Sequence, residues 1–352
     1  METFRLEGVW DKRLESLNWG STPTKVFTFC LAESTRSNYN TQIGKLRYYC
    51  QVRQIQFPPQ PHESAIFADF LCAVGATSDR PESILRSVSA ALNTLYQGLG
   101  LVNPMATVEL KMLQTALVKS GTTRPAKHSK VMPCVAFQDL FRSWPDNDQL
   151  ALENLRLKAV TLFALVFMAR PSDMAPKGVT VDYETGVARH INFTTDQIVF
   201  NDDGSLTVTF FGIKNDSTRT GFEVRIPPSA EMTLDPVRCL KDYLRVTTAS
   251  RVKGGPVFLA LKRPYKGLSS GTIGEILKKA ISLAGLENQG FTPRSFRPTG
   301  ATAAVNSGCP PETAMQLGRW KTKEVFFNRY VYPNAPQEYT TNVLQYSGIE
   351  LH

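Results

Sequence analysis

The sequence is poor in the residues that build metal centres and disulfide frameworks. Its 352 residues include 4 histidines and 6 cysteines, and no two cysteines form a Cys-x-x-Cys pair. Because the histidines stand apart from one another and from the cysteines, the pattern does not favour a zinc site. Scattered cysteines without a dense framework indicate reduced thiols in an intracellular protein. We therefore expect neither a metal ion nor another cofactor.

Long apolar runs are missing as well. The longest, residues 159–169, is broken only by Thr161 and is too short to span a bilayer, so it predicts a buried helix. Residues 1–11 carry charges and lack the apolar core of a signal peptide. Neither segment indicates a membrane partner. Positive charge, in contrast, is in excess: the formal net charge of +9 suits a polyanionic partner, although many basic proteins bind no nucleic acid.

The length and a change in periodicity predict two domains. Residues 1–33 form an N-terminal arm without a strong pattern. Residues 34–119 have the apolar spacing of about four helices, which predicts a small helical bundle. Residues 120–135 are polar and basic with two prolines and predict a linker. This linker is either a solvated tether or a basic strap along DNA.

Residues 136–335 mix two periodicities and predict a second, α+β domain. Helical spacing indicates helices at residues 135–144, 153–169, 235–246, 270–284, 299–307 and 310–317. Alternating residues in Leu206–Phe210 and Phe222–Ile226, with a turn-rich segment between them, predict a β-hairpin. The fold class is therefore mainly α with a small β-sheet. The tail of residues 336–352 would either pack on its own domain or contact a neighbouring protomer.

Two pairs of charged residues could bind an anion. Arg170 follows the long apolar helix, and Pro171 disfavours further helix there, so its side chain lies where the chain turns, close to Asp173. This pair could equally be a structural ion pair. Arg294 and Arg297 stand three apart at a helix start near Ser295, where two guanidiniums and free N–H groups would face one spot. The alternative is a surface pair of arginines.

Two further segments carry reactive side chains. Lys214 opens the hairpin tip, where a lysine could enter a DNA groove and give a proton to a leaving oxygen, or could simply be solvated. Near the C-terminus, Gly318 is expected to end one helix and Thr322 to cap the next, with Tyr330 at that helix's end. A tyrosine in such a place is usually a packing residue.

These pieces occur in the order shared by the tyrosine recombinases, or phage-type integrases, and the sequence resembles that family from about residue 34 to about residue 335. The family has Arg-x-Ser-Glu/Asp after a long helix, a hairpin lysine, His-x-x-Arg at a helix start, a Leu-Gly-(His/Trp) turn, and a tyrosine about ten residues later. The matching residues here are Arg170, Asp173, Lys214, Arg294, Arg297, Gly318, Trp320 and Tyr330. The Gly-Arg-Trp-Lys and Ser-Phe-Arg forms resemble the recombinases of eukaryotic mobile elements, the DIRS/Ngaro-like retrotransposons and the cryptons.

The sequence departs from the family pattern at three places. Arg294 stands in the usual histidine position and is a poor general base, because arginine stays protonated. The spacing from Gly318 to the tyrosine is about two residues longer than usual, which leaves Tyr332 as a rival to Tyr330. Arg319 and Trp320 compete for the His/Trp position, and we favour Trp320 because its indole N–H can donate to a phosphate oxygen.

The resemblance implies a core-binding helical domain, a catalytic domain and a reaction through a 3′-phosphotyrosine without a cofactor. Tyr330 would be the nucleophile and Lys214 the proton donor, with a phosphate held by Arg170, Arg294, Arg297 and Trp320 and supported by Asp173 and Arg319. Lys127, Lys130 and Arg219 would contact the DNA backbone. The expected partners are specific sites on double-stranded DNA and further copies of the chain in a tetramer. The location would be the nucleus for a eukaryotic mobile element, and otherwise the cytoplasm or nucleoid.

Three alternatives remain at this stage. The chain could be a DNA-binding protein that kept the fold and lost catalysis, as Arg294 and the altered spacing would suggest. It could be a type IB topoisomerase-like enzyme, which uses the same chemistry on one duplex as a monomer. It could also be a plain helical DNA-binding regulator, although five ordered motif matches disfavour this.

Overall fold

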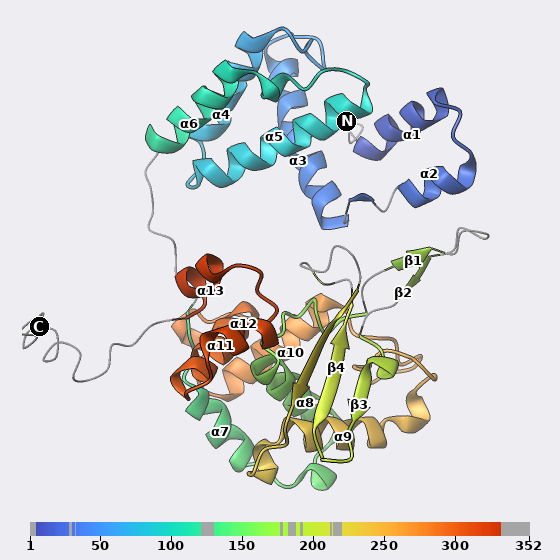
Figure 1. Ribbon diagram of the computed structural model, residues 1–352, viewed down its shortest axis with the longest axis vertical. Helices are drawn as coiled ribbons and strands as arrows, with labels where there is room; N and C mark the ends of the chain where they lie inside the picture. Colours follow the sequence, from blue (N-terminus) through green and yellow to red (C-terminus); the bar gives the residue numbers. More distant parts are fainter. Residues whose placement is uncertain are drawn as a thin grey trace, which may run out of the picture. The chain divides into compact units, whose positions relative to one another are not determined.

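A computed structural model describes residues 5–27, 30–31, 33–120, 130–176, 179–181, 188–190, 193–211, 213 and 220–331 (Figure 1). The chain divides into two compact units. Unit 1 comprises Met1–Ala126 with Val181–Ala188, and unit 2 comprises Lys127–Thr180 with Arg189–His352. In the described part of the chain, no helix has the length and apolar character needed to cross a membrane. The six cysteines are free thiols.

Unit 1 contains the expected helical bundle. Its four helices are α3 (Glu33–Val52), α4 (Ser64–Ala76), α5 (Pro81–Gly98) and α6 (Val108–Ser120). Helix α5 is the central one and contacts the other three, with its buried stripe running from Leu85 to Tyr96. Pro81 occupies the first turn of α5, as the sequence predicts, because the missing N–H costs nothing there.

The segment expected to be an arm holds two more helices, α1 (Leu6–Ser16) and α2 (Ser21–Phe27). Helix α1 contacts α3 and α5, and only Leu6 and Leu14 of it are buried. The Leu6 N–H donates to Asn40 Oδ1 at 2.8 Å, and Trp10 lies against Gly98. The sequence did not predict these helices, since two buried residues in eleven give too sparse an apolar stripe to be recognised.

Unit 2 combines helices with a small antiparallel sheet. The helices are α7 (Cys134–Arg142), α8 (Leu152–Val166), α9 (Pro236–Val246), α10 (Ser270–Leu283), α11 (Phe296–Asn306), α12 (Pro311–Leu317) and α13 (Lys323–Arg329). The sheet has the order β3 (Ile198–Phe200), β4 (Leu206–Phe210), β5 (Phe222–Ile226). A separate pair is formed by β1 (Val179–Val181) and β2 (Ala188–His190). The predicted hairpin strands are confirmed, and β3 was missed because three residues are too few to show alternation.

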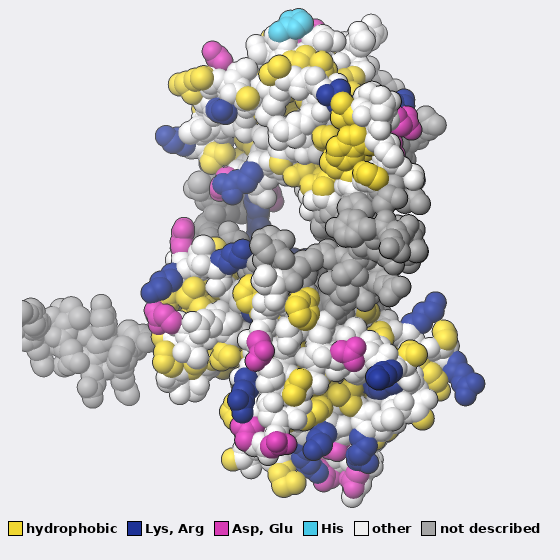
Figure 2. All heavy atoms as spheres, turned by 45° about the vertical axis from the view of Figure 1, so that its right-hand side comes forward, with side chains coloured by type: hydrophobic (Ala, Val, Ile, Leu, Met, Phe, Trp, Pro, Cys, Tyr) yellow, Lys and Arg dark blue, Asp and Glu magenta, His cyan; other side chains and the backbone are white. Residues whose placement is uncertain are grey.

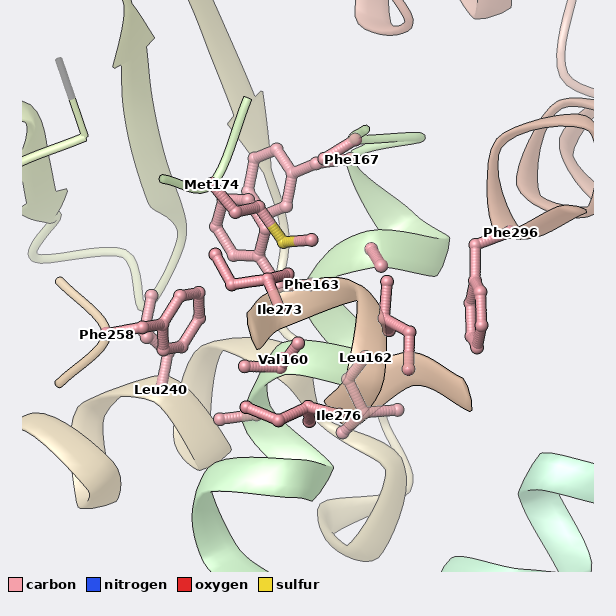
Figure 3. Packing of buried hydrophobic residues seen from close by; sticks show 14 of the residues in the cluster. Val160, Leu162, Phe163, Phe167, Met174, Leu240, Phe258, Ile273, Ile276 and Phe296 are labelled. Atoms are coloured by element: carbon pink, nitrogen blue, oxygen red, sulfur yellow. The ribbon is translucent and has the colours of Figure 1, made fainter. Parts of the chain in front are cut away.

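Helix α8 forms the centre of the core of unit 2, which confirms the buried helix predicted from its apolar run. It contacts α9, α10 and α11, and Phe163 stacks on Phe167 with ring centroids 4.2 Å apart. Figure 3 shows these two rings beside Met174 in the packed cluster. The helix ends at Val166 and not at residue 169 as predicted, because Met168 adopts a left-handed conformation with φ +47°.

Helices α8 and α11 approach each other so closely that only glycine fits at residue 300. A Cβ added to Gly300 would lie 2.1 Å from the carbonyl oxygen of Leu165. This contact of backbone on backbone fixes the N-terminal end of α11 against the C-terminal end of α8. The two arginine segments predicted from the sequence are thereby brought together.

Candidate active site

Arg297 lies at the centre of the candidate site and is almost completely buried. Pro298 occupies the first turn of α11, so this helix starts at Phe296, close to the expected start near Ser295. The Arg297 guanidinium donates through Nη1 to the Met168 carbonyl and through Nη2 to the Gly318 carbonyl, both at 2.5 Å. It is 3% exposed. Arg297 therefore links the end of α8 to the turn that follows α12.

A single carboxylate serves the other two arginines of the site. Asp173 Oδ2 lies 3.5 Å from Arg170 Nη1 and 3.5 Å from Arg319 Nη2. The same oxygen accepts a hydrogen bond from the Arg170 backbone N–H at 3.1 Å. The Asp173 side chain is 3% exposed, whereas that of Arg170 is 26% exposed. Asp173 thus holds Arg170 from the buried side, while the side chain of Arg170 remains partly exposed.

Trp320 enters the site through a turn that differs from the one expected. Gly318 keeps a right-handed conformation, and Arg319 is the left-handed residue with φ +62°. Glycine is required at 318 because an added Cβ would lie 1.7 Å from Cζ3 of Trp320. The Trp320 ring, folded back over Gly318, stacks on Arg297 with Cζ 3.9 Å from the ring centroid. Of the two rivals for the His/Trp position, Trp320 contacts Arg297, and Arg319 points into the core.

Tyr330 lies at the end of α13, as the sequence predicts, and packs on Trp320. The two ring centroids are 4.9 Å apart, and Cζ of Arg297 lies 5.7 Å from the Tyr330 ring. The Tyr330 carbonyl accepts a hydrogen bond from Thr302 Oγ1 of α11 at 2.9 Å. Thr302 was not singled out in the sequence, and no local signal marks it, since its partner is a backbone oxygen far along the chain.

The site holds more positive charge and more donors than its own acceptors satisfy. Arg170 and Arg319 share the carboxylate of Asp173, whereas Arg297 donates to two backbone carbonyls. Burial, followed by the nearby charges of Arg170 and Arg319, lowers the pKa of Arg297 to about 9. Among the described residues, Arg297 Nε and Trp320 Nε1 are buried without a hydrogen-bond partner. A buried donor without a protein partner can be matched by a bound water or ion, and the positive charge here suits an anion.

Arg294 does not share this position with Arg297, contrary to the expectation that both would face one spot. Arg294 is exposed and lies in the short 3-10 turn Pro293–Ser295, and no hydrogen bond or ion pair joins it to the cluster within the described chain. Arg294 lies in the 3-10 turn, whereas Arg297 lies in the first turn of α11. Arg294 is available only to a partner that approaches from solvent.

Lys130 is held by protein groups close to the start of unit 2. Its Nζ donates to the carbonyl of Gln289 at 2.6 Å and lies 5.9 Å from the centroid of the Phe291 ring.

Four residues predicted from the sequence lie outside the described residues. They are the predicted DNA contacts Lys127 and Arg219, the predicted proton donor Lys214 and the rival nucleophile Tyr332. In the described chain, no three His, Cys, Asp or Glu side chains come together as a metal site would need.

Surface charge on the drawn face does not by itself mark the site. In the view of Figure 2, Lys and Arg side chains are dispersed over both units among acidic and apolar side chains. The candidate site is therefore identified by its buried arginines and not by a continuous basic surface on that face.

The chain is similar to proteins whose names describe integrases and recombinases. It is 24% identical to an integrase/recombinase xerD homolog of Selenomonas ruminantium. The alignment of 309 residues covers 85% of this chain and 82% of the relative. No protein-family model matches the chain. The Gly-Arg-Trp likeness to eukaryotic mobile elements is not tested by this relative and stays a prediction.

Solved structures share the fold. The XerH site-specific recombinase bound to its difH substrate superposes with a TM-score of 0.58 at 12% identity, covering 95% of this chain and 87% of that one. The Tn1549 transposon integrase in complex with circular intermediate DNA gives a TM-score of 0.50 at 13% identity, covering 97% and 99%. The expected fold class, a helical bundle followed by an α+β domain with a small sheet, is confirmed.

Proposed function

We propose that this chain is a tyrosine recombinase, which cuts and rejoins DNA strands at specific sites through a 3′-phosphotyrosine intermediate. The observation that carries the proposal is the pair of unpaired buried donors, Arg297 Nε and Trp320 Nε1, within a cluster of three guanidiniums and one carboxylate. A phosphodiester supplies the negative charge and the acceptor oxygens that this cluster lacks.

The proposed chemistry forms one bond for each bond that it breaks. The Tyr330 oxygen attacks the scissile phosphorus and its phenol proton passes to water, while the bond from phosphorus to the 5′-oxygen breaks. Lys214, proposed from its place in the sequence alone, protonates the departing 5′-oxygen. The bond energy is kept in the covalent link, so an incoming 5′-hydroxyl can reverse the step on another strand without ATP.

The arginines would act on the charge that grows in the transition state. A guanidinium has five N–H donors, so Arg297 keeps donors beyond those used by the carbonyls of Met168 and Gly318. Arg170 reaches solvent and would contact the phosphate from the open side, with Arg294 beside the DNA backbone. Donors held in place before the reaction stabilise the developing charge most effectively, because they need no reorganisation.

The substrate proposed is double-stranded DNA at the ends of a mobile element, recognised by several copies of the chain. The solved XerH site-specific recombinase is bound to its difH substrate, and the solved Tn1549 transposon integrase is in complex with circular intermediate DNA. We extend this to the present chain as integration or excision by a homo-tetramer, in the nucleus if the element is eukaryotic. Affinity would come largely from phosphate contacts and fall with salt.

One observation favours a second candidate function, a DNA-binding protein without catalysis. Arg294 occupies the position where the family usually has histidine, and an exposed arginine cannot take a proton at neutral pH. The cluster around Arg297 would then bind a phosphate without cutting the strand.

The test uses nicked suicide substrates taken from the DNA that flanks the gene. After cleavage the short downstream strand diffuses away, so a covalent complex of protein and DNA accumulates and survives SDS. The wild type is compared with Tyr330→Phe and Tyr332→Phe. Loss of the complex only in Tyr330→Phe is the expected result.

Other outcomes discriminate among the alternatives. Loss of the complex only in Tyr332→Phe would keep the chemistry and reassign the nucleophile. DNA binding by the wild type without any covalent complex would overturn the catalytic proposal in favour of the DNA-binding one. Cleavage by a protein that stays monomeric on one duplex would point to a topoisomerase-like enzyme.

A further inference from the structure

Arg319 is a buried arginine that the proposed chemistry does not use. It lies at the first position beyond the C-cap of α12, where the Trp320 N–H bonds the Met315 carbonyl and the Arg319 N–H bonds the Gln316 carbonyl. That position usually holds glycine, because a left-handed backbone costs a side-chain-bearing residue roughly 1–2 kcal/mol. Arg319 adopts it with φ +62°, and its side chain is 0% exposed. A residue keeps such a strained backbone conformation only where the interactions around it outweigh the cost.

The surroundings of Arg319 belong to three separate segments of unit 2. Its Nη1 donates to the Leu317 carbonyl and its Nη2 to the Phe167 carbonyl, both at 3.1 Å. Nη2 also lies 3.5 Å from Asp173 Oδ2, and Cζ lies 4.0 Å from the centroid of the Phe210 ring at the end of β4. One planar group thus joins the exit of α8, the turn before Trp320 and the last residue of a central strand.

The Asp173 contact connects Arg319 to the reacting phosphate. The oxygen that Arg319 approaches is the one that holds both the side chain and the backbone N–H of Arg170. We infer that Arg319 is a positioning residue: it fixes Asp173, and through Asp173 the guanidinium of Arg170, relative to the segment that carries Trp320 and Tyr330. This inference rests on the proposed function, since it assigns Arg319 a role in charge stabilisation by that site.

The geometry requires arginine and no other residue at 319. Two carbonyls, one carboxylate and an aromatic face surround the same group, and only the planar fork of a guanidinium meets them together. Lysine offers a point charge to Asp173 but cannot bond both carbonyls in one plane. Because no part of the side chain is exposed, Arg319 acts behind the phosphate site and not on the phosphate.

The experiment compares two suicide substrates in single-turnover cleavage. One has the ordinary phosphodiester and the other a neutral methylphosphonate at the scissile position, which forms and breaks the same bonds without the negative charge that Arg170 stabilises. Arg319→Met is expected to cleave the phosphodiester about 10²-fold more slowly, the usual cost of a misplaced group. On the methylphosphonate it should lose no more than the control variant does.

The matched control is Arg251→Met. Arg251 is a half-buried arginine of unit 2, and it donates to the carbonyls of Pro256 and Val257 at 2.7 Å each, outside the candidate site. A loss that is general to the removal of a packed arginine would be the same on both substrates, as expected for Arg251→Met. Equal losses for Arg319→Met would therefore overturn the inference.

Two further results keep the test decisive. If Arg319→Met does not fold, Arg319→Lys takes its place, and it should show the same selective loss on the charged substrate to a smaller degree; equal losses again overturn the role. If the wild type forms no covalent complex with the phosphodiester, the proposed function fails first. If it does and the selective loss is absent, only the role of Arg319 fails.

Discussion

The guanidinium of Arg297 lies over the ring of Trp320, with Cζ 3.9 Å from the ring centroid, and both side chains keep a buried N–H without a partner among the described residues. A cation on an aromatic face is attracted by the ring, which holds the two groups together. The pair therefore presents two donors that are already in place when a phosphate arrives.

Replacing Trp320 with phenylalanine removes the indole N–H donor and keeps an aromatic ring, so it tests the donor alone. Trp320→Phe should slow formation of the covalent complex by roughly 10²-fold, the scale of losing one preorganised donor. Its unfolding free energy should change by less than about 1 kcal/mol, because removing a buried unpaired donor offsets the lost ring volume. Trp144→Phe, where the ring packs on Phe141 instead, is the control and should leave cleavage unchanged. Unaltered cleavage in Trp320→Phe would show that the indole N–H has no part in the reaction.

The close approach of α8 and α11 predicts a sharp difference between two glycines. Gly300→Ala would place a methyl group 2.1 Å from the Leu165 carbonyl oxygen and should lower the unfolding free energy by about 3 kcal/mol or more. Gly274→Ala, inside α10 with nothing within 4 Å of the added Cβ, should raise it by about 0.5–1 kcal/mol. Denaturant unfolding of both variants measures this. Similar effects at the two positions would contradict the backbone contact that aligns Arg297 with Arg170.

The elements that follow from local pattern were predicted from the sequence. Alternation in Leu206–Phe210 and Phe222–Ile226 gave both strands at their observed bounds, and turn chemistry placed Tyr330 at the end of its helix. Sequence reasoning favoured Trp320 over Arg319 for its indole N–H alone and could not predict where either side chain points. Their directions depend on the Trp320 ring folding over Gly318, which is a tertiary contact.

The partners of the site arginines were also beyond sequence reasoning. Arg297 is held by the carbonyls of Met168 and Gly318, and Arg319 by those of Phe167 and Leu317. Every residue has a backbone carbonyl, so the sequence cannot show which of them accepts a hydrogen bond from an arginine. It therefore identified the arginines but not which of them is buried. For the same reason it placed Arg294 and Arg297 together, whereas one is exposed and the other buried.

Binding of inorganic phosphate should depend on pH in a definite direction. Burial together with the charges of Arg170 and Arg319 lowers the pKa of Arg297 to about 9. A bound anion favours the charged guanidinium and raises that pKa, so binding takes up protons near pH 9. Phosphate affinity should therefore be highest below pH 9 and fall as the pH rises through it.

The phosphate prediction is checked by thermal unfolding with phosphate against sodium chloride of equal ionic strength. A ligand at 100 times its Kd stabilises the folded state by about 2.7 kcal/mol, so the shift is measurable. Arg142→Met, which removes an exposed arginine paired with Glu231, should keep the effect and its pH dependence. Arg297→Met should lose both, and phosphate stabilisation that survives in Arg297→Met would place the anion elsewhere.

Lys214 stays a prediction from the sequence, and a modified leaving group tests it directly. If Lys214 protonates the 5′-oxygen, Lys214→Ala should slow cleavage by about 10²–10⁴-fold, the usual contribution of a general acid. A bridging sulfur in place of the 5′-oxygen leaves as a thiolate and needs no proton, so this substrate should restore the rate. Arg219→Ala, at another basic residue between β4 and β5 in the sequence, is the control. Arg219→Ala should lower the affinity for DNA and make that affinity less dependent on salt. The substrate with the bridging sulfur should not restore its cleavage rate, because the phosphate contact is the same in both substrates. Rescue of both variants, or of neither, would remove Lys214 from the chemistry.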